Sequence, residues 1–220
     1  MNNKEILEHI DHTLLQATST WEQIKEICED AIRFGTASVC IPPTFVERVH
    51  KAYPELNICT VIGFPLGYHT TYVKTEEALE AVRNGANEID MVVNLGDVKE
   101  GRFEKVTQEI AALKAAAGPR ILKVIIETCY LTEEEKIRLC HCVTDAKADF
   151  IKTSTGFGSD GAKMEDILLF KRNIGSCVKI KAAGGVKSRE DLERFLLAGC
   201  DRIGTSSAVK LLQGETAEGY

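Results

Sequence analysis

Short runs of apolar, often β-branched residues alternate along the chain with longer stretches in which apolar residues recur every three or four positions. The short runs predict eight strands: His12–Leu15, Ser38–Ile41, Cys59–Gly63, Glu88–Asn94, Leu122–Glu127, Phe150–Thr155, Val178–Ala183 and Arg202–Ser206. The longer stretches predict six helices between them: Trp21–Phe34, Val73–Asn84, Lys99–Ala117, Glu133–Ala146, Ala162–Arg172 and Ser188–Leu197. Thr132 followed by Glu135 forms a capping-box pattern, which is typical of a helix start.

Successive predicted strands begin 21 to 34 residues apart, without a linker or a shift in composition. This alternation predicts parallel β/α units, and strands that are apolar on both faces are typical of a sheet covered on both sides. Eight units fit a closed (β/α)8 TIM barrel. The alternative, an open doubly wound sheet, is disfavoured because no GxGxxG or GxxxxGK[ST] pattern occurs. We therefore expect an α/β fold with one domain over Met1–Tyr220.

Composition narrows the classes of function. Hydrophobic residues are 44% and charged residues 27% of the chain, as in ordinary globular proteins, and no apolar run approaches the ~20 residues of a membrane span. A net charge of −6 disfavours general nucleic-acid binding. The polar amino terminus lacks a secretory signal pattern, and the eight cysteines contain no CxxC pair. We expect reduced thiols in a cytoplasmic protein, with no metal, nucleic-acid or membrane partner.

Several charged residues lie inside predicted strands that should otherwise be apolar: Asp90, Glu127, Lys152, Lys179 and Lys181. Lys152 and Lys181 belong to neighbouring strands. If both point inward, two ammonium groups ~4 Å apart at an effective dielectric of ~20 repel by about 4 kcal/mol. That repulsion corresponds to roughly three units of lowered pKa on one lysine. A neutral lysine attacks carbonyls and forms a Schiff base, and Asp90 is placed to move the protons.

The residues alone leave two points open at these strands. Lys179 has the same side-chain parity as Lys181, so periodicity does not decide which of them approaches Lys152. A strand lysine can also lie at an edge with its ammonium in solvent, and an aspartate can cap a turn. The joint occurrence of Lys152, Lys181 and Asp90 at the ends of different strands favours a functional cluster.

Glycines and hydroxyls follow the last two predicted strands, where TIM barrels usually bind phosphate. The segments are Ala183-Gly184-Gly185-Val186-Lys187 and Gly204-Thr205-Ser206-Ser207. Glycines let backbone N–H groups approach an anion, and a helix start attracts it. Gly156 is a third candidate contact, and ordinary tight turns are the alternative. Cys40 is expected near the pocket without a nucleophilic role, and Asp11 near a substrate hydroxyl or in a structural role.

In their order along the chain, the motifs resemble the 2-deoxyribose-5-phosphate aldolases, a family of class I aldolases. The segments are IDHTLL (10–15), SVCIPP, EIDMVVN, LKVIIET, FIKTSTGF, IKAAGGV, RIGTSS and SSAVKLL (206–212). The resemblance implies a (β/α)8 barrel and reversible cleavage of 2-deoxy-D-ribose 5-phosphate to D-glyceraldehyde 3-phosphate and acetaldehyde, without metal or other cofactor. A barrel of this size is expected to form a homo-oligomer, a dimer or a tetramer.

The resemblance also assigns roles to residues. It makes Lys152 the Schiff-base lysine, Lys181 the lysine that perturbs it, Asp90 the proton-relay aspartate and Tyr220 a helper in proton transfer. With the loops above, the expected substrate-binding positions are Asp11, Thr13, Cys40, Thr155, Gly156, Gly184, Gly185, Lys187, Gly204, Ser206 and Ser207. Phe157 departs from members that carry lysine there, and Lys187 is the candidate for that charge.

Two other functions stay open at this level. A sugar-phosphate isomerase would use Asp90 and Glu127 as acid and base and would form no imine. A non-catalytic barrel would bind a sugar phosphate as a sensor. Replacement of Lys152 separates these functions from an aldolase, because only the aldolase depends on it for a covalent intermediate.

Overall fold

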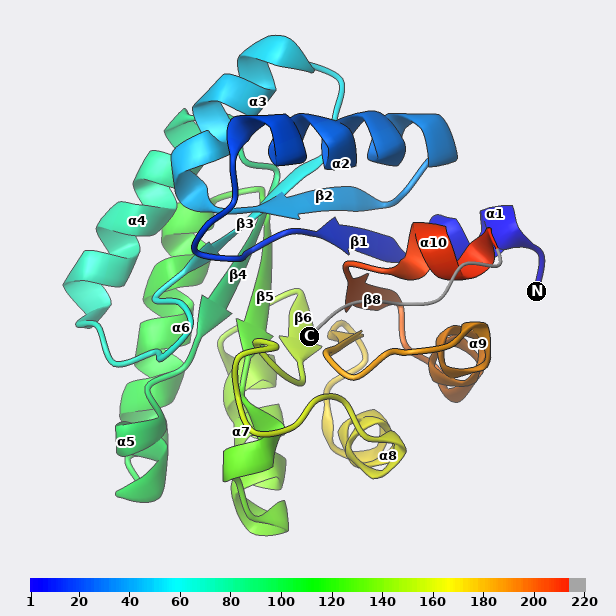
Figure 1. Cartoon of the computed structure of the whole chain (residues 1–220). Coiled ribbons are helices and arrows are strands. Elements are labelled where there is room, and N and C mark those ends of the chain that lie inside the picture. Colours follow the sequence, from blue (N-terminus) through cyan, green and yellow to red (C-terminus); the bar gives the residue numbers. More distant parts are fainter. Residues whose placement is uncertain (214–220) are drawn as a thin grey trace.

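Eight parallel strands close into a barrel in the computed structural model, which describes residues 1–213 (Figure 1). The strands pair in chain order, and β1 closes the ring against β8. They are β1 (Ile10–Thr13), β2 (Ser38–Ile41), β3 (Ile58–Ile62), β4 (Glu88–Val92), β5 (Ile121–Ile125), β6 (Phe150–Lys152), β7 (Lys179–Ala183) and β8 (Arg202–Thr205). The predicted (β/α)8 barrel is confirmed. Among the described residues, no helix has the length and apolarity needed to cross a membrane.

Helices cover the outside of the barrel (Figure 1). They are α1 (Asn3–Leu7), α2 (Trp21–Phe34), α3 (Val46–Ala52), α4 (Thr71–Arg83), α5 (Leu95–Lys99), α6 (Phe103–Ala117), α7 (Glu133–Asp145), α8 (Met164–Asn173), α9 (Arg189–Ala198) and α10 (Ala208–Leu212), with 3-10 turns at Pro43–Phe45 and Thr128–Tyr130. The first and last helices lie side by side, and Asn3 Nδ2 donates to the Leu212 carbonyl at 3.0 Å.

Local signals explain where most helices begin. Capping boxes at Thr20, Thr132 and Ser188 start α2, α7 and α9. The predicted helix Lys99–Ala117 ends where α6 ends but begins too early, because α6 starts at Phe103 and Lys99 is the last residue of the separate helix α5. Gly101 lies between the two helices at φ +72°, a left-handed conformation that a helix interior does not take. The pattern also missed α1 and α3.

The strands differ from the prediction mainly at their carboxyl ends. Strand β6 ends at Lys152, so Thr153–Thr155, predicted as strand, belong to the loop that follows. Strand β4 ends at Val92 and β5 at Ile125, two residues earlier than predicted in each case. In β4 and β5 the apolar run continues one residue past the end of the strand, at Val93 and Ile126, which explains the overshoot there. As a result Lys152 is the last residue of its strand, at the end of the barrel where TIM enzymes place their chemistry.

The two faces of the barrel wall have different surroundings. The outer face packs against the helices in a large apolar core that includes Val39, Ile89, Val124 and Ile180. The inner face holds a small separate apolar cluster, made by Leu15, Cys40, Cys59 and Val61 with Phe64 packed against it. Charged residues occupy other inner positions at paired registers, with Asp90 opposite Lys123, Lys152 opposite Lys181, and Lys181 opposite Arg202.

Candidate active site

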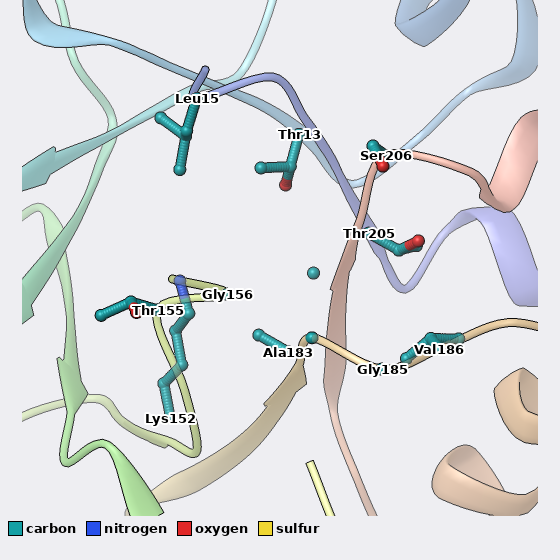
Figure 2. Close-up of a pocket in the computed structure, with 12 residues that line it drawn as sticks. Thr13, Leu15, Lys152, Thr155, Gly156, Ala183, Gly185, Val186, Thr205 and Ser206 are labelled. Atoms are coloured by element: carbon teal, nitrogen blue, oxygen red, sulfur yellow. The ribbon is translucent and has the colours of Figure 1, made fainter. Parts of the chain in front are cut away.

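A pocket opens at the carboxyl ends of the strands (Figure 2). The amino group of Lys152 points into it from the end of β6. Its lining consists of Thr13, Leu15, Lys152, Thr155, Gly156, Ala183, Gly184, Gly185, Val186, Gly204, Thr205 and Ser206.

Lys152 meets Asp90 at the floor of this pocket. Lys152 Nζ donates to Asp90 Oδ2 at 2.7 Å, and Lys181 Nζ donates to the same oxygen at 2.8 Å. Lys152 is 3% exposed, whereas Asp90 and Lys181 are fully buried. Strands β4, β6 and β7 thus bring together the three residues that the sequence singled out. Lys152 is the member of this trio that reaches the pocket wall.

The structure decides between the two candidate lysines of β7. Lys179 is exposed at the start of the strand, with its Nζ 5.8 Å from the centre of the Phe150 ring. Lys181 is the residue that approaches Lys152 through their shared carboxylate. Burial by itself would lower the pKa of Lys181, but the carboxylates of Asp11 and Asp90 outweigh burial and raise that pKa above its usual range. The expected lowering of pKa therefore does not occur at Lys181.

Lys123, which the sequence pattern did not single out, lies in the interior of the barrel. This fully buried residue of β5 donates to Asp90 Oδ1 at 2.9 Å and lies 2.5 Å from Glu88 Oε2. Its Nζ is also 3.5 Å from Asp11 Oδ2 and 3.2 Å from Cys59 Sγ. A lysine inside the apolar run ILKVII was a visible signal, since a buried ammonium needs partners. Its partners lie on other strands, so the run alone did not show them.

Arg202 of β8 completes a buried charged cluster, which we define as Asp11, Glu88, Asp90, Lys123, Lys152, Lys181 and Arg202. Arg202 Nη1 donates to Asp11 Oδ1 and lies 3.1 Å from Glu88 Oε2. The cluster holds four basic side chains and three carboxylates, so one positive charge is in excess when all are ionised. Burial would raise the pKa of Asp90, but Lys123, Lys152 and Lys181 together hold it well below its usual range.

Asp11 belongs to this cluster rather than to the pocket wall. It is fully buried, pairs with Lys181 and Arg202, and accepts a hydrogen bond from Ser38 Oγ at 2.7 Å. Burial by itself would raise the pKa of Asp11, but the neighbouring cations Lys123, Lys181 and Arg202 lower that pKa by more.

Three other residues that the sequence analysis expected at the substrate are not part of the described pocket lining: Cys40, Lys187 and Ser207. Lys187 is exposed, and Ser207 Oγ is 3.0 Å from Thr205 Oγ1. Tyr220 lies outside the described residues.

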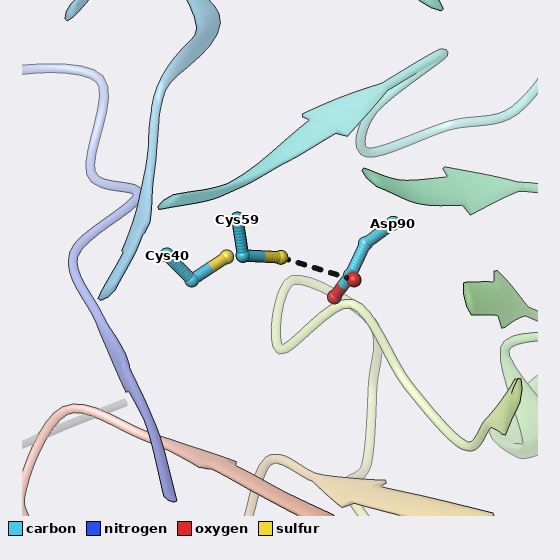
Figure 3. A group of neighbouring side chains, drawn as sticks. All are labelled: Cys40, Cys59 and Asp90. Carbon is cyan, nitrogen blue, oxygen red and sulfur yellow. Dashed lines mark hydrogen bonds between the residues drawn. The ribbon is translucent and has the colours of Figure 1, made fainter. Parts of the chain in front are cut away.

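Cys40, Cys59 and Asp90 lie close together and are all buried (Figure 3). Their sulfur and oxygen atoms are within 4.8 Å of one another, and Cys59 Sγ donates to Asp90 Oδ1 at 3.2 Å. Two thiols and a carboxylate are chemically suitable metal ligands. Asp90 already contacts three ammonium groups, however, and these would repel a divalent cation. The electrostatics therefore disfavour a metal at this place.

Glu127 shapes the loop that follows β6. Its carboxylate accepts hydrogen bonds from Thr155 N at 3.1 Å and Thr155 Oγ1 at 2.5 Å, and Thr155 Oγ1 in turn accepts from Phe157 N at 3.0 Å. Its backbone is left-handed, with φ 54°, a conformation that costs a non-glycine residue about 1–2 kcal/mol. Burial raises the pKa of Glu127, against the effect of the Thr155 hydrogen bonds. Glu127 thus holds the pocket loop, and it does not line the described pocket.

Gly161 is a second residue that the sequence pattern did not single out. A Cβ at this position would lie 2.4 Å from the Gly184 carbonyl carbon and 2.8 Å from Gly185 N, which are backbone atoms of the pocket wall. The next residue, Ala162, donates its N–H to the Ala183 and Gly184 carbonyls, both at 3.1 Å. The loop after β6 therefore supports the glycine loop after β7 through backbone contact, and Gly161 makes that approach possible.

Acid should destabilise the fold through the charged cluster. The pKa values of Asp11 and Asp90 lie below the ordinary 3.8, so the unfolded chain binds more protons in acid. Their stabilisation is complete above about pH 4 and is lost below it, whereas the raised pKa values of Lys123 and Lys181 matter only above pH 10.5. We expect the free energy of unfolding in urea to fall by at least ~2 kcal/mol between pH 6 and pH 3.

Salt separates this effect from that of surface charges. Exposed pairs are screened at 0.5 M salt, whereas a buried cluster is screened much less, so the fall should persist there. A free energy of unfolding that stays constant between pH 6 and pH 3 would contradict the assigned ion pairs.

Comparisons with known proteins agree with this geometry. Residues 6–208 match the family model described as DeoC/LacD family aldolase. The chain is 60% identical over 221 residues to the deoxyribose-phosphate aldolase of Clostridium botulinum (strain Alaska E43 / Type E3), with 100% of both chains covered. A solved structure titled "QR15, an Aldolase" is 37% identical, with a TM-score of 0.91 over 96% of this chain and 95% of that one. A tetrameric deoxyribose phosphate aldolase from Aeropyrum pernix is 29% identical, with a TM-score of 0.88 over 97% and 92%.

Proposed function

This chain belongs to the DeoC/LacD family of aldolases, and we propose that it reversibly cleaves 2-deoxy-D-ribose 5-phosphate to D-glyceraldehyde 3-phosphate and acetaldehyde. The observation that carries the proposal is the amino group of Lys152, which points into the pocket while bound to Asp90 at 2.7 Å. The name of the 60% identical relative supports the choice of substrate.

The reaction begins at Lys152 in this proposal. Its neutral amine attacks C1 of the open-chain sugar, and the resulting carbinolamine loses water to form an imine. Within the described residues Lys152 forms one ion pair, with Asp90, which it shares with Lys181. Lys152 is also the cluster amine that lines the pocket, so it is the one that a substrate carbonyl can reach.

Bond cleavage then uses the imine as an electron sink. A base removes the proton of the C3 hydroxyl, the C2–C3 bond breaks, and its electron pair forms an enamine on C2. The triose phosphate leaves as its aldehyde. Lys181 and Asp90, 2.8 Å apart, are the pair that passes these protons through water. Protonation of C2 and hydrolysis of the imine release acetaldehyde and regenerate Lys152. Help from Tyr220 in the protonation stays a prediction.

The glycine loops supply the place for the phosphate group. Gly156, Gly184 and Gly185 have positive φ values between 74° and 88°, which bring backbone atoms to the pocket surface without a Cβ in the way. Ser206 faces them from the end of β8 (Figure 2). These elements are typical of phosphate binding by backbone N–H groups. Lys187 is exposed beside this wall, and a role for its charge stays a prediction.

The isomerase alternative is less compatible with the site. It requires Asp90 and Glu127 as a free acid and base facing the substrate. Asp90 instead contacts Lys123, Lys152 and Lys181, and Glu127 binds Thr155. A product assay tests the assignment directly. Incubation with 2-deoxy-D-ribose 5-phosphate should release equal amounts of acetaldehyde and triose phosphate, measured with coupled dehydrogenases. Formation of an isomeric sugar phosphate without acetaldehyde would overturn the proposal.

Gly161→Ala should weaken substrate binding more than it slows turnover. The added methyl would push the Gly184–Gly185 backbone out of position, while Lys152 and Asp90 stay in place. We expect KM for the phosphorylated sugar to rise about tenfold, which corresponds to ~1.4 kcal/mol, with kcat changed by less than threefold. Gly96→Ala is the matched control, because a Cβ there meets only Asn94 Oδ1 at 3.1 Å, in α5. Equal KM values in the two variants would contradict the role given to Gly161.

We also propose that the chain forms a homo-oligomer, a dimer or a tetramer. The Aeropyrum pernix relative, described as tetrameric, supports the higher state. Light scattering after size-exclusion chromatography should give two or four times the chain mass of 24.2 kDa. A mass of one chain would contradict it. A cytoplasmic location stays a prediction from the sequence.

A further inference from the structure

Two cysteines occupy paired positions on neighbouring strands inside the barrel. Cys40 of β2 and Cys59 of β3 are paired in the strand register, and both are fully buried. Figure 3 shows the Cys40 sulfur pointing toward Cys59, whereas the Cys59 sulfur points toward Asp90 in the reduced protein. Paired residues on adjacent strands have Cα atoms about 4.8 Å apart, which lies inside the 4.4–6.8 Å range of disulfides. We propose that Cys40 and Cys59 form an oxidisable dithiol, which a small peroxide converts to a disulfide that suppresses catalysis reversibly.

The surroundings give the two thiols different roles. The neighbouring thiol of Cys59 lowers the pKa of Cys40, and the charges of Lys181 and Lys152 add to this effect against burial and Asp90. The pKa of Cys59 is raised by burial and by Cys40. Burial raises the pKa of three other thiols to about 12, those of Cys28, Cys140 and Cys200. Cys40 is thus suited to attack an oxidant, and Cys59 to remain protonated until the second step.

The dithiol and the active-site pocket share one side chain. Leu15 lines the pocket and also packs in the inner apolar cluster with Cys40 and Cys59. In this proposal, movement of Leu15, which is 8% exposed, gives an oxidant in the pocket access to the sulfurs. Hydrogen peroxide is nearly as small as water and passes such a gap, whereas bulky thiol reagents do not. A substrate bound in the pocket should therefore protect the pair.

The chemistry balances with hydrogen peroxide as the oxidant. The Cys40 thiolate attacks one peroxide oxygen, the O–O bond breaks, and the hydroxide that leaves takes up a proton to become water. Cys40 is now a sulfenic acid. Cys59 Sγ attacks the Cys40 sulfur, the S–O bond breaks, and the departing hydroxide accepts the Cys59 proton. Two thiols are oxidised to one disulfide, and one peroxide is reduced to two waters. An added dithiol reverses the change by exchange.

The disulfide would act on catalysis through Asp90. In the reduced protein Cys59 Sγ donates to Asp90 Oδ1 at 3.2 Å and lies 3.2 Å from Lys123 Nζ. Formation of the disulfide removes this S–H donor and turns the sulfur toward Cys40. Asp90 then loses one of the groups that hold it against Lys152 and Lys181. This consequence rests on the proposed function, whereas disulfide formation itself does not.

The test uses the full-length protein treated with hydrogen peroxide, with and without 2-deoxy-D-ribose 5-phosphate. After alkylation in denaturant and digestion, mass spectrometry should find a peptide that joins Cys40 to Cys59, at a lower yield when the sugar phosphate is present. The activity of the oxidised protein should fall at least tenfold, and dithiothreitol should restore it. Cys28→Ser, another buried thiol, should behave like the original chain.

Cys59→Ser separates the disulfide from other damage. Each variant is compared with its own reduced form. Without the second thiol, Cys40 should oxidise beyond the sulfenic acid, and dithiothreitol should no longer restore activity. Absence of the Cys40–Cys59 peptide, or its formation without loss of activity, would overturn the proposal. If the reduced protein shows no aldolase activity, the proposed function fails, while the peptide map still reports on the dithiol.

Discussion

Replacement of Lys152 by alanine is expected to lower kcat/KM by at least ~10⁴-fold, because it removes the nucleophile that forms the covalent intermediate. Lys152 is the lysine that lines the described pocket, and Asp90 holds its amino group at the floor. Incubation with acetaldehyde followed by borohydride reduction should leave a two-carbon adduct on Lys152 of the original chain. Peptide mapping by mass spectrometry should find no adduct on the variant.

The control for this variant is Lys179→Ala. Lys179 lies on β7, the strand next to that of Lys152, but it is exposed at the amino end of β7, away from the pocket. Its replacement should therefore leave the activity and the adduct on Lys152 unchanged. An adduct on Lys181 would mean that the two lysines have exchanged roles. If Lys152→Ala lost its activity only in part, the result would favour an isomerase. If the variant kept its affinity for the sugar phosphate and neither protein showed any reaction, the result would favour a sensor.

The second large effect is expected on stability, from Lys123→Met. The substitution keeps the volume but removes a cation that contacts Asp90 at 2.9 Å and Glu88 at 2.5 Å. Two buried carboxylates then lose a partner, and breaking one side of such a pair typically costs 3–5 kcal/mol. We expect a loss of about this size in the free energy of unfolding, measured by urea denaturation. Activity should fall as well, because Asp90 can no longer keep its position.

Two further variants make this result specific. Lys51→Met removes an exposed lysine paired with Glu47, and such surface pairs contribute about 0–1 kcal/mol. The double variant Lys123→Met/Glu88→Gln removes charge from both sides of one buried pair. Its loss of stability should be smaller than the sum of the two single losses, because the residues are in direct contact. A change below ~1 kcal/mol in Lys123→Met would contradict the described cluster.

Much of the fold could be predicted from local patterns. Strand Ser38–Ile41 and helix Trp21–Phe34 were predicted with the observed bounds, since each combines clear periodicity with turn or capping residues. Regular spacing of strands was enough for the barrel because parallel β/α units leave few other arrangements. Helix α3 was missed because Val46–Ala52 is short and follows two prolines, which read as a loop.

The types of residue in the candidate site could be predicted from the sequence, but the balance of charge between them could not. Lys152, Lys181 and Asp90 stood out because lysine and aspartate are rare inside apolar strands. The lowered pKa expected from the two lysines was argued from one pair alone. Asp11 reverses that direction at Lys181, and it comes from β1, far away along the chain. Lys123 and Arg202 were missed for the same reason, since their partners lie on other strands.

Periodicity and composition predicted the strand order and the end of the barrel expected to carry the chemistry, and they marked Lys152, Lys181 and Asp90 as candidates; the family resemblance was needed to single out Lys152 as the Schiff-base lysine. These features depend on residues that are close in sequence. Barrel closure decided which charges meet in the interior, which thiols face each other, and which loop supports the glycines. The reason is physical: interactions between buried charges depend on distances of a few ångströms between strands, and the register across strands appears only in the folded chain.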